Sequence, residues 1–584
     1  MSDQIKVEFD VEATMRDGTV LRANVFRPAE EGSYPVALTR TPYGKDFASV
    51  SPMLDAPRLA RAGYIVVIQD VRGRYRSEGE WVTFANEAND GYDTVEWAAQ
   101  LPGSNGKVGM FGASYFGFTQ WIAAAQQPPH LKAIVPSITW ADVRDGTSWR
   151  GGAFELGLMA YWHLATLALD ITLKRYKDAH QLQMYQAIVA AVNELNRLRP
   201  EGYYSLPLKD FEPLKKLDLA VETLEQAVEQ PFSREASAPY SIAEAYDKVQ
   251  VPSLNIGGWY DIFTNGVLQN FNGVRNAGGT PEARQTKLIM GPWSHVNYSN
   301  TVGDIDFGFG ASMALMNLQT DLTGLTQRWF DYWLKGIDNG IMKEAPVKLF
   351  VMGDNAWRDE QEWPLARTVY TPYYFHSQGR ANTLNGNGFL STEKPGSESA
   401  DHFTYDPANP VHTYGGGTLM NSLYGPGVKD QRSIEERDDV LVFTSEVLGQ
   451  DTEVTGPISV KLWASTDGPD TDFVARLVDV HPDGFAQNLA DGIIRARYRN
   501  GDTPELLEPG QVYEFNIDLW STANVFKAGH RIRVDLTSSN FPRWDRNHNT
   551  GEPFGHGTEL RPARQTILHD AEHPSHVLLP IIPR

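Results

Sequence analysis

The first 140 residues alternate short apolar runs with helical patterns. Residues 64–70 form a run rich in β-branched side chains, typical of a parallel strand that is covered on both faces. Residues 7–26 alternate around Asp17-Gly18, which predicts a β-hairpin. Further strands are predicted at residues 35–39, 107–112 and 131–136, and helices at 54–62, 90–101 and 115–126. Strands and helices that alternate through short connections predict a doubly wound, mostly parallel α/β sheet.

The pattern changes after residue 140. Residues 165–198 read as long helices with aromatic residues nearby, which predicts an inserted helical cap. The α/β pattern resumes with a strand at 251–256, a helix at 264–276 and a strand at 287–290. Beyond residue 353 short β-prone runs between turn clusters predict a jelly-roll β-sandwich, at 440–443, 458–463, 473–480, 513–519 and 531–537. We therefore expect three domains: an α/β domain of residues 1–141 and 241–353, a cap of residues 142–240, and a jelly roll of residues 354–584.

Composition narrows the function. A chain of 584 residues is too long to fold around a single hydrophobic core. The absence of cysteine excludes disulfides, thiolate catalysis and Cys-based metal sites. A net charge of −21 argues against nucleic acid as a partner, and it is compatible with a monomer or a homodimer. The N-terminus shows no apolar signal segment, and no apolar run approaches the length that spans a bilayer. We therefore expect a cytoplasmic protein with no membrane partner.

Ser114 lies where a predicted strand turns sharply into a predicted helix. Gly112 ends the strand and Gly117 begins the helical pattern, so small residues allow the close backbone approach of a nucleophile elbow. The usual elbow has glycine two places after the serine, whereas here Phe116 occupies that place. A glycine-rich strand–helix connection without chemistry is the alternative interpretation.

The resumed sheet supplies partners for this serine. An activated serine needs a general base, and the base needs an orienting acid. Asp261 directly follows one predicted strand and His295 another, and either could instead be a helix cap or a surface loop residue. Both occupy strand ends in the order Ser, Asp, His, which is the order of an α/β hydrolase. We therefore predict a Ser114–His295–Asp261 triad in an α/β-hydrolase fold.

An oxyanion intermediate also needs hydrogen-bond donors. The backbone N–H of Tyr115 follows the serine and is one candidate. The loop after residues 35–39 usually supplies the second donor, and here it contains Tyr43, whose phenol could donate. A half-buried packing role for Tyr43 is an equal alternative at this point.

Other polar clusters are interpreted structurally. Asp70 and Arg72 are expected to form an ion pair at a strand end. Residues 545–551 resemble a calcium loop, but the glycine is one place late and His556 stands where the bidentate acid belongs. Gly308-Phe-Gly310 lacks the third glycine and the strand–helix setting of a dinucleotide site, and Gly415-Gly-Gly417 is interpreted as a flexible loop rather than a phosphate cradle. We expect no metal and no cofactor.

Six segments together resemble the cocaine-esterase family, in the X-prolyl dipeptidyl-peptidase and α-amino-acid ester hydrolase group of serine hydrolases. They are Arg40-Thr-Pro-Tyr-Gly44, Gln69-Asp-Val-Arg-Gly73, Ser77-Glu-Gly-Glu80, Gly112-Ala-Ser-Tyr-Phe-Gly117, Gly257-Gly-Trp-Tyr-Asp261 and Gly291-Pro-Trp-Ser-His295. The resemblance runs nearly end to end, and the group's Gly-x-Ser-Tyr-x-Gly motif accounts for the irregular elbow.

The resemblance implies a role for each matching residue. Ser114 corresponds to the nucleophile, His295 to the base, Asp261 to the orienting acid, and Tyr43 with the Tyr115 amide to the oxyanion hole. It also implies a catalytic α/β domain, a helical cap and a C-terminal jelly roll. The family's aromatic substrate pocket corresponds to Trp162, Phe263, Leu419 and Met420.

We therefore expect a cofactor-independent serine hydrolase that cleaves small-molecule carboxylic esters with bulky or aromatic acyl groups through an acyl-enzyme. One alternative is an X-Pro dipeptidyl-peptidase or α-amino-acid ester hydrolase, which would need an acidic cluster to bind an ammonium group. Glu155 in the cap could belong to such a cluster. A second alternative is a non-catalytic protein whose jelly roll binds carbohydrate or a protein, although an intact triad argues against it.

Overall fold

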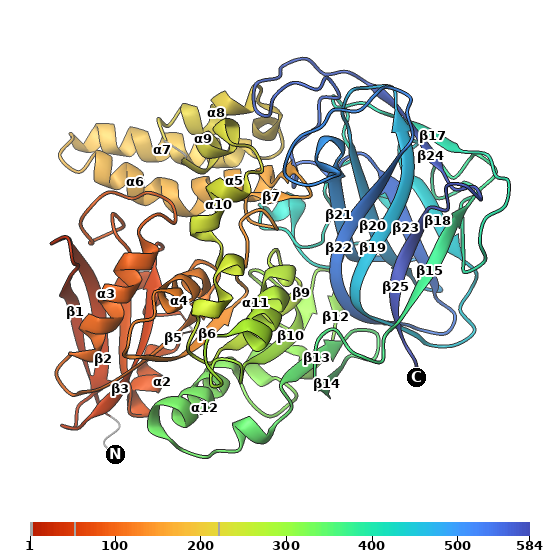
Figure 1. The fold of residues 1–584 in the computed structure, drawn as a ribbon. Coiled ribbons are helices and arrows are strands. Elements are labelled where there is room, and N and C mark those ends of the chain that lie inside the picture. Colours follow the sequence, from red (N-terminus) through yellow and green to blue (C-terminus); the bar gives the residue numbers. More distant parts are fainter. Residues whose placement is uncertain (1–3, 52–53, 220–221) are drawn as a thin grey trace.

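The computed structural model describes residues 4–51, 54–219 and 222–584. Figure 1 shows an α/β part in red, orange and green, with yellow cap helices above it and a blue β domain at one side. The α/β part contains one ten-stranded sheet in the order β1-β2-β4-β3-β5-β6-β9-β10-β13-β14. Its strands are β1 (Ile5–Thr14), β2 (Val20–Pro28), β3 (Tyr34–Thr41), β4 (Ile65–Asp70), β5 (Ser104–Ala113), β6 (Leu131–Ser137), β9 (Leu254–Tyr260), β10 (Lys287–Ser294), β13 (Val347–Val351) and β14 (Ala356–Glu360).

The centre of this sheet is parallel from β4 to β13, and antiparallel strands border it on both sides. On β4, Val66 and Ile68 join one core cluster while Ile65 and Val67 join another. Successive side chains of a strand point to opposite faces, so the sheet is covered on both sides. The predicted doubly wound α/β sheet is therefore confirmed.

Helices form the two covering layers. One layer includes α2 (Ala56–Arg61) and α12 (Leu322–Lys335), and the other includes α3 (Glu87–Ala99), α4 (Tyr115–Ala125) and α11 (Thr264–Ala277). The expected Asp70–Arg72 ion pair is wrong. Arg72 instead forms ion pairs with Asp90 and Asp17, at 2.7 Å each, while Asp70 accepts the Lys45 backbone N–H. Arg72 thus ties the loop after β4 to α3.

The cap follows β6. Its helices are α5 (Leu156–Trp162), α6 (Ala168–Arg175), α7 (Gln181–Arg197), α8 (Glu212–Lys215), α9 (Glu222–Glu229) and α10 (Arg234–Ser237). The helical stretch expected at 165–198 is broken: α6 ends at Arg175, and His180 caps a new helix by accepting the Leu182 N–H. The two helices can therefore fold back on each other over the sheet (Figure 1).

The expectation that no apolar segment approaches the length of a membrane span is corrected by one helical stretch. Leu156–Arg175, which includes α5 and α6, is long and apolar enough to cross a membrane by length and composition. However, 61% of its most apolar window is buried inside the protein, as in a core helix. Its residues pack with other cap helices and with the β domain.

The C-terminal part is an eleven-stranded sheet in which all pairs are antiparallel except β16–β18. Its strands are β15 (Val369–His376), β16 (Phe389–Ser391), β17 (Asp401–Tyr405), β18 (Leu441–Ser445), β19 (Thr452–Thr466), β20 (Asp472–Val480), β21 (Ala486–Arg495), β22 (Tyr513–Phe526), β23 (Arg531–Thr537), β24 (Ala563–Leu568) and β25 (His576–Ile582). The predicted β-rich C-terminal architecture is confirmed, whereas the exact residue limits of the three domains stay a prediction.

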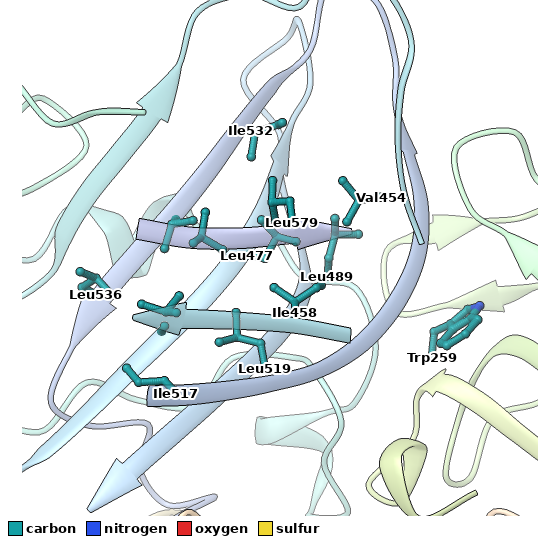
Figure 2. Packing of buried hydrophobic residues seen from close by; sticks show 14 of the residues in the cluster. Trp259, Val454, Ile458, Leu477, Leu489, Ile517, Leu519, Ile532, Leu536 and Leu579 are labelled. Carbon is teal, nitrogen blue, oxygen red and sulfur yellow. The ribbon is translucent and has the colours of Figure 1, made fainter. Parts of the chain in front are cut away.

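The β domain and the α/β domain share one hydrophobic core. Figure 2 shows part of this cluster, which contains Leu477, Ile517 and Leu536 of the β domain and also Trp259 of β9. The Trp259 indole donates a hydrogen bond to the Phe350 carbonyl at 2.8 Å. Because β9 carries Asp261 at its end, this packing helps to fix the position of that carboxylate.

Candidate active site

Ser114 lies between β5 and α4 with φ 59° and ψ −122°, a backbone conformation that residues other than glycine rarely adopt. Gly112 allows this turn because a Cβ there would lie 2.7 Å from the Phe116 Cβ. At Gly117 a Cβ would lie 2.7 Å from the Thr139 Cβ, so the later glycine lets α4 pack on the chain that follows β6. The shifted glycine therefore has a packing reason, and the strained turn exposes a serine as a nucleophile elbow does.

Three side chains form a chain of hydrogen bonds at the carboxyl ends of the strands. His295 Nε2 lies 3.0 Å from Ser114 Oγ, and His295 Nδ1 lies 2.8 Å from Asp261 Oδ2. Because an ionised carboxylate only accepts, Nδ1 carries the proton and Nε2 is free to accept the serine proton. The other Asp261 oxygen accepts the Phe263 backbone N–H at 2.7 Å, which fixes the orientation of the carboxylate. The structure thus brings together the three residues predicted as a triad.

Tyr43 lies beside this chain, in the loop after β3. Its phenol oxygen accepts a hydrogen bond from the Trp162 indole at 2.9 Å, so the phenol proton remains available for donation. Burial raises the pKa of Tyr43 to about 12, although its hydrogen bonds with Trp162 and Ser114 oppose this effect. The phenol is therefore a neutral donor at any ordinary pH.

The Tyr115 backbone N–H is the first of α4 and has no acceptor within that helix. The Tyr115 side chain points to a different network, since its hydroxyl donates to Glu87 Oε1 at 2.9 Å. Arg40 pairs with the other Glu87 oxygen at 2.7 Å. Burial raises the pKa of Glu87, and the adjacent Arg40 guanidinium opposes that shift. Sequence analysis missed this buried Arg40–Glu87–Tyr115 network, because its members lie far apart along the chain.

A largely apolar cavity opens beside Ser114 and His295. Of the predicted pocket residues, Trp162, Phe263 and Leu419 line it. Met420 does not: it belongs to the buried cap cluster and packs closely on Gly157. The lining also contains residues that the sequence did not indicate, namely Phe84, Trp140, Thr147, Ser148, Leu158, Met159, His163 and Ile262. Trp140, which comes soon after the end of β6, could have been proposed from its place near a strand end.

Glu155 lies outside the cavity lining. It is buried, accepts the Trp544 indole N–H at 2.9 Å and faces Arg543 at 3.9 Å. Burial raises the pKa of Glu155 to about 7. None of the described residues that line the cavity is an aspartate or a glutamate. Among its described lining residues, the cavity therefore offers no carboxylate that could pair with a substrate ammonium.

Among the described residues, the loop at 545–551 and one His/Asp cluster have side chains of the type that bind metals. Asp545 of the loop at 545–551 and Asp472 of β20 both accept hydrogen bonds from the Arg495 guanidinium, at 2.9–3.0 Å, so an arginine stands where a cation would. Asp479, His481 and His530 bring potential ligand atoms within 4.8 Å of one another. Asp479 is hydrogen-bonded to His530 at 2.8 Å. Neither cluster contributes to the cavity beside Ser114.

Ser114 lies on a strained strand–helix turn, and Asp261 and His295 follow β9 and β10 of the same ten-stranded α/β sheet. This arrangement defines a serine hydrolase of the α/β-hydrolase class. The family models agree. Residues 17–297 match the X-Pro dipeptidyl-peptidase (S15 family), and residues 339–578 match the X-Pro dipeptidyl-peptidase C-terminal non-catalytic domain.

Relatives cover the whole chain. The cocaine esterase of Rhodococcus sp. (strain MB1 Bresler) is 40% identical over 99% of both chains. Among solved structures, an α-amino acid ester hydrolase has a TM-score of 0.80 at 26% identity and covers 100% of this chain and 98% of its own. An aminopeptidase from a marine sediment Thaumarchaeota archaeon has a TM-score of 0.79 at 26% identity, with 99% and 97% covered. The chain belongs to the X-Pro dipeptidyl-peptidase (S15) family of serine hydrolases, and the predicted resemblance to its cocaine-esterase members is confirmed.

Proposed function

We propose that the protein hydrolyses carboxylic esters with bulky or aromatic acyl groups, with Ser114 as the nucleophile. The observation that carries this proposal is the Ser114–His295–Asp261 hydrogen-bonded chain beside an aromatic cavity. The relationship to a cocaine esterase supports it.

The reaction follows from the geometry. Ser114 Oγ attacks the ester carbonyl carbon while His295 Nε2 takes its proton, and Asp261 stabilises the imidazolium that forms. The carbonyl oxygen becomes an oxyanion that accepts hydrogen bonds from the Tyr43 phenol and the Tyr115 N–H. When the intermediate collapses, His295 gives its proton to the leaving alcohol and an acyl-enzyme remains. Water then attacks this acyl group, with His295 again acting as base, and the acid is released.

The cavity favours an aryl acyl group over an aminoacyl group. Aromatic and aliphatic side chains line most of it, and no carboxylate is present among its described lining residues. A buried ammonium without a counter-charge is strongly unfavourable, whereas an aromatic ring gains from burial and ring stacking. The X-Pro dipeptidyl-peptidase and α-amino-acid ester hydrolase activities are thus second candidates, supported by the names of relatives rather than by the cavity.

A comparison of leaving-group release from three substrates tests this function. We expect kcat/KM for a p-nitrophenyl benzoate to exceed that for the p-nitrophenyl ester of a free α-amino acid by about tenfold or more, from the cost of burying the ammonium. An X-Pro p-nitroanilide should be a poorer substrate than either. Faster turnover of the aminoacyl ester or of the anilide would reverse the assignment.

Tyr43→Phe tests the oxyanion hole. The substitution removes one donor and leaves the ring, so we expect kcat to fall about 100- to 1000-fold with little change in KM. Because the pKa of Tyr43 is about 12, wild-type activity should not decline between pH 8 and pH 10 through this group. Measurements of kcat and KM for both proteins across that range check the two expectations. A loss confined to KM would assign Tyr43 to substrate binding instead.

The homodimer, the cytoplasmic location and the absence of nucleic-acid and membrane partners are also kept as proposals. The first surface to probe for self-association is the set of exposed apolar side chains on α6 and α7 of the cap. These are Leu169, Leu173, Leu182, Tyr185, Val189 and Val192. Size-exclusion chromatography with light scattering measures the mass directly.

A further inference from the structure

Asp479, His481 and His530 lie together at one end of the β20–β23 strand pair. The antiparallel register of this pair places Val480 opposite Arg531. One step further along, His481 lies opposite His530, and the centroids of their rings are 4.5 Å apart. Successive side chains of a strand point to opposite faces, so Asp479 and His481 project to the same face of the sheet. The register therefore gathers a carboxylate and two imidazoles at one place.

The distances between these side chains suit a metal ion. One potential ligand atom from each of the three lies within 4.8 Å of the other two. The closest pair is His530 Nδ1 and Asp479 Oδ1, at 2.8 Å. Two imidazole nitrogens and a carboxylate oxygen form a ligand set that holds Zn²⁺ in proteins, with water completing the coordination. A metal ion would replace the proton that Nδ1 and Oδ1 share.

The charge at this place also favours a cation. The Asp479 side chain is only 3% exposed, and its single ion-pair partner among the described residues is His530, which is charged only when protonated. A buried carboxylate without a permanent counter-charge is costly, so a divalent cation would stabilise it. Both imidazoles are partly exposed, which gives an ion access from solvent.

Hydrogen bonds from neighbouring residues hold the three side chains in place. The Asn524 amide donates to the second oxygen of Asp479, Oδ2, at 3.1 Å. Gln487 Oε1 lies 3.2 Å from His481 Nε2, while Gln487 Nε2 donates to the Tyr260 hydroxyl at 3.2 Å. Gln487 can therefore hold the His481 ring through a hydrogen bond or serve as a further oxygen ligand. Outer hydrogen bonds of this kind orient the ligands of metal sites.

We propose that Asp479, His481 and His530 form a structural site for one divalent transition-metal ion of the Zn²⁺ class. Imidazole ligands favour Zn²⁺, Co²⁺ or Ni²⁺, whereas Mg²⁺ and Ca²⁺ prefer oxygen ligands. The site lies outside the cavity beside Ser114, so it is independent of the proposed esterase function. The proposal revises the expectation of no metal, because loop motifs could not reveal two histidines that are far apart along the chain.

The ion would stabilise the contact between the β domain and the α/β domain. Asn524, which binds Asp479, forms a β-bridge with Met352 directly after β13. Gln487 reaches the α/β domain through its hydrogen bond with Tyr260 of β9. An ion that binds only the folded protein shifts the unfolding equilibrium toward the folded state. We therefore expect Zn²⁺ to raise the thermal midpoint.

Calorimetric titration of the chelator-treated, full-length protein with Zn²⁺ tests the site. We expect the wild type to bind one equivalent of Zn²⁺ and to give no comparable heat with Mg²⁺. Loss of an outer-shell partner typically weakens metal binding 10- to 100-fold, so removal of a ligand in His481→Gln or His530→Phe should weaken it by more than about 100-fold. His573→Phe is the matched control, since His573 Nδ1 contacts Asp570 Oδ1 at 3.1 Å in the same domain but belongs to no group of three. It should keep wild-type affinity.

The result is decided by binding to folded protein. Circular dichroism in the presence of chelator verifies the fold of each variant, and either ligand variant alone suffices if the other does not fold. Absence of Zn²⁺ binding by the wild type, or wild-type affinity in a folded ligand variant, would overturn the proposal. Zn²⁺ should also raise the thermal midpoint of the wild type and of His573→Phe by a few degrees, and leave the ligand variants unchanged. An equal rise in all proteins would assign the ion to another place and refute the site.

Discussion

Ser114→Ala should reduce kcat for ester hydrolysis by about 10⁴-fold or more, while KM changes little. The substitution removes the only atom that forms the acyl-enzyme bond in the proposed reaction, and losses of this size follow removal of the serine in other triad enzymes. The residual rate reflects the oxyanion hole and substrate binding. Release of p-nitrophenol from a benzoyl ester by wild type and variant, at equal protein concentration, gives the comparison.

The fold of this variant must be verified separately. Alanine has a Cβ like serine, so the positive φ at position 114 carries similar strain in both proteins. We therefore expect the thermal midpoint to change by no more than a few degrees. A fluorophosphonate should label the wild type at Ser114 and leave the variant unlabelled. Substantial turnover by a folded, unlabelled Ser114→Ala protein would show that another group performs the chemistry.

The catalytic domain could be predicted well because its signals are local. The run that became β4 is buried on both faces, and the turn at Asp17-Gly18 joins two strands that do pair. The cap was predicted less well, because a continuous helical pattern cannot reveal the break between Arg175 and Gln181. In the β domain, strands such as β24 (Ala563–Leu568) lack a strong β-prone run. Pairing with β17 and β19 supplies the stabilisation that their own sequence does not show.

The candidate site divides in the same way. Ser114, Asp261 and His295 could be placed together because parallel strands bring their carboxyl ends to one edge of a sheet. Other features of the site depend on contacts between distant segments. These are the packing of Met420 in the cap cluster, the burial of Glu155 against Trp544, and the hydrogen bond from the Trp162 indole to Tyr43. The π-helical turn at His163–Leu167, which follows Trp162, was not indicated by any sequence pattern either. Long-range packing thus determines which side chains surround the substrate cavity, whereas the order of strands along the chain is enough to predict the triad.

Asp261→Asn should lower kcat by about 10⁴-fold, the loss seen when the acid of a serine-protease triad becomes an amide. The local hydrogen bonds explain why. One Asp261 oxygen accepts the Phe263 N–H at 2.7 Å, so the asparagine carbonyl would keep that bond and turn its NH₂ group toward His295 Nδ1. Two donors would then face each other unless the imidazole moved its proton to Nε2. With that proton in place, Nε2 can no longer accept the proton of Ser114.

Asp401→Asn is a matched control for this substitution. Asp401 is another buried aspartate that contacts a histidine, with His569 Nε2 at 2.9 Å from Oδ2, but it lies in the β domain and outside the cavity lining. We expect Asp401→Asn to lower the thermal midpoint and to leave kcat of the folded protein within about threefold of wild type. Equal losses of kcat in both variants would show that stability explains the effect. A loss in Asp261→Asn alone would identify its carboxylate as the group that holds His295 in the tautomer that accepts the serine proton.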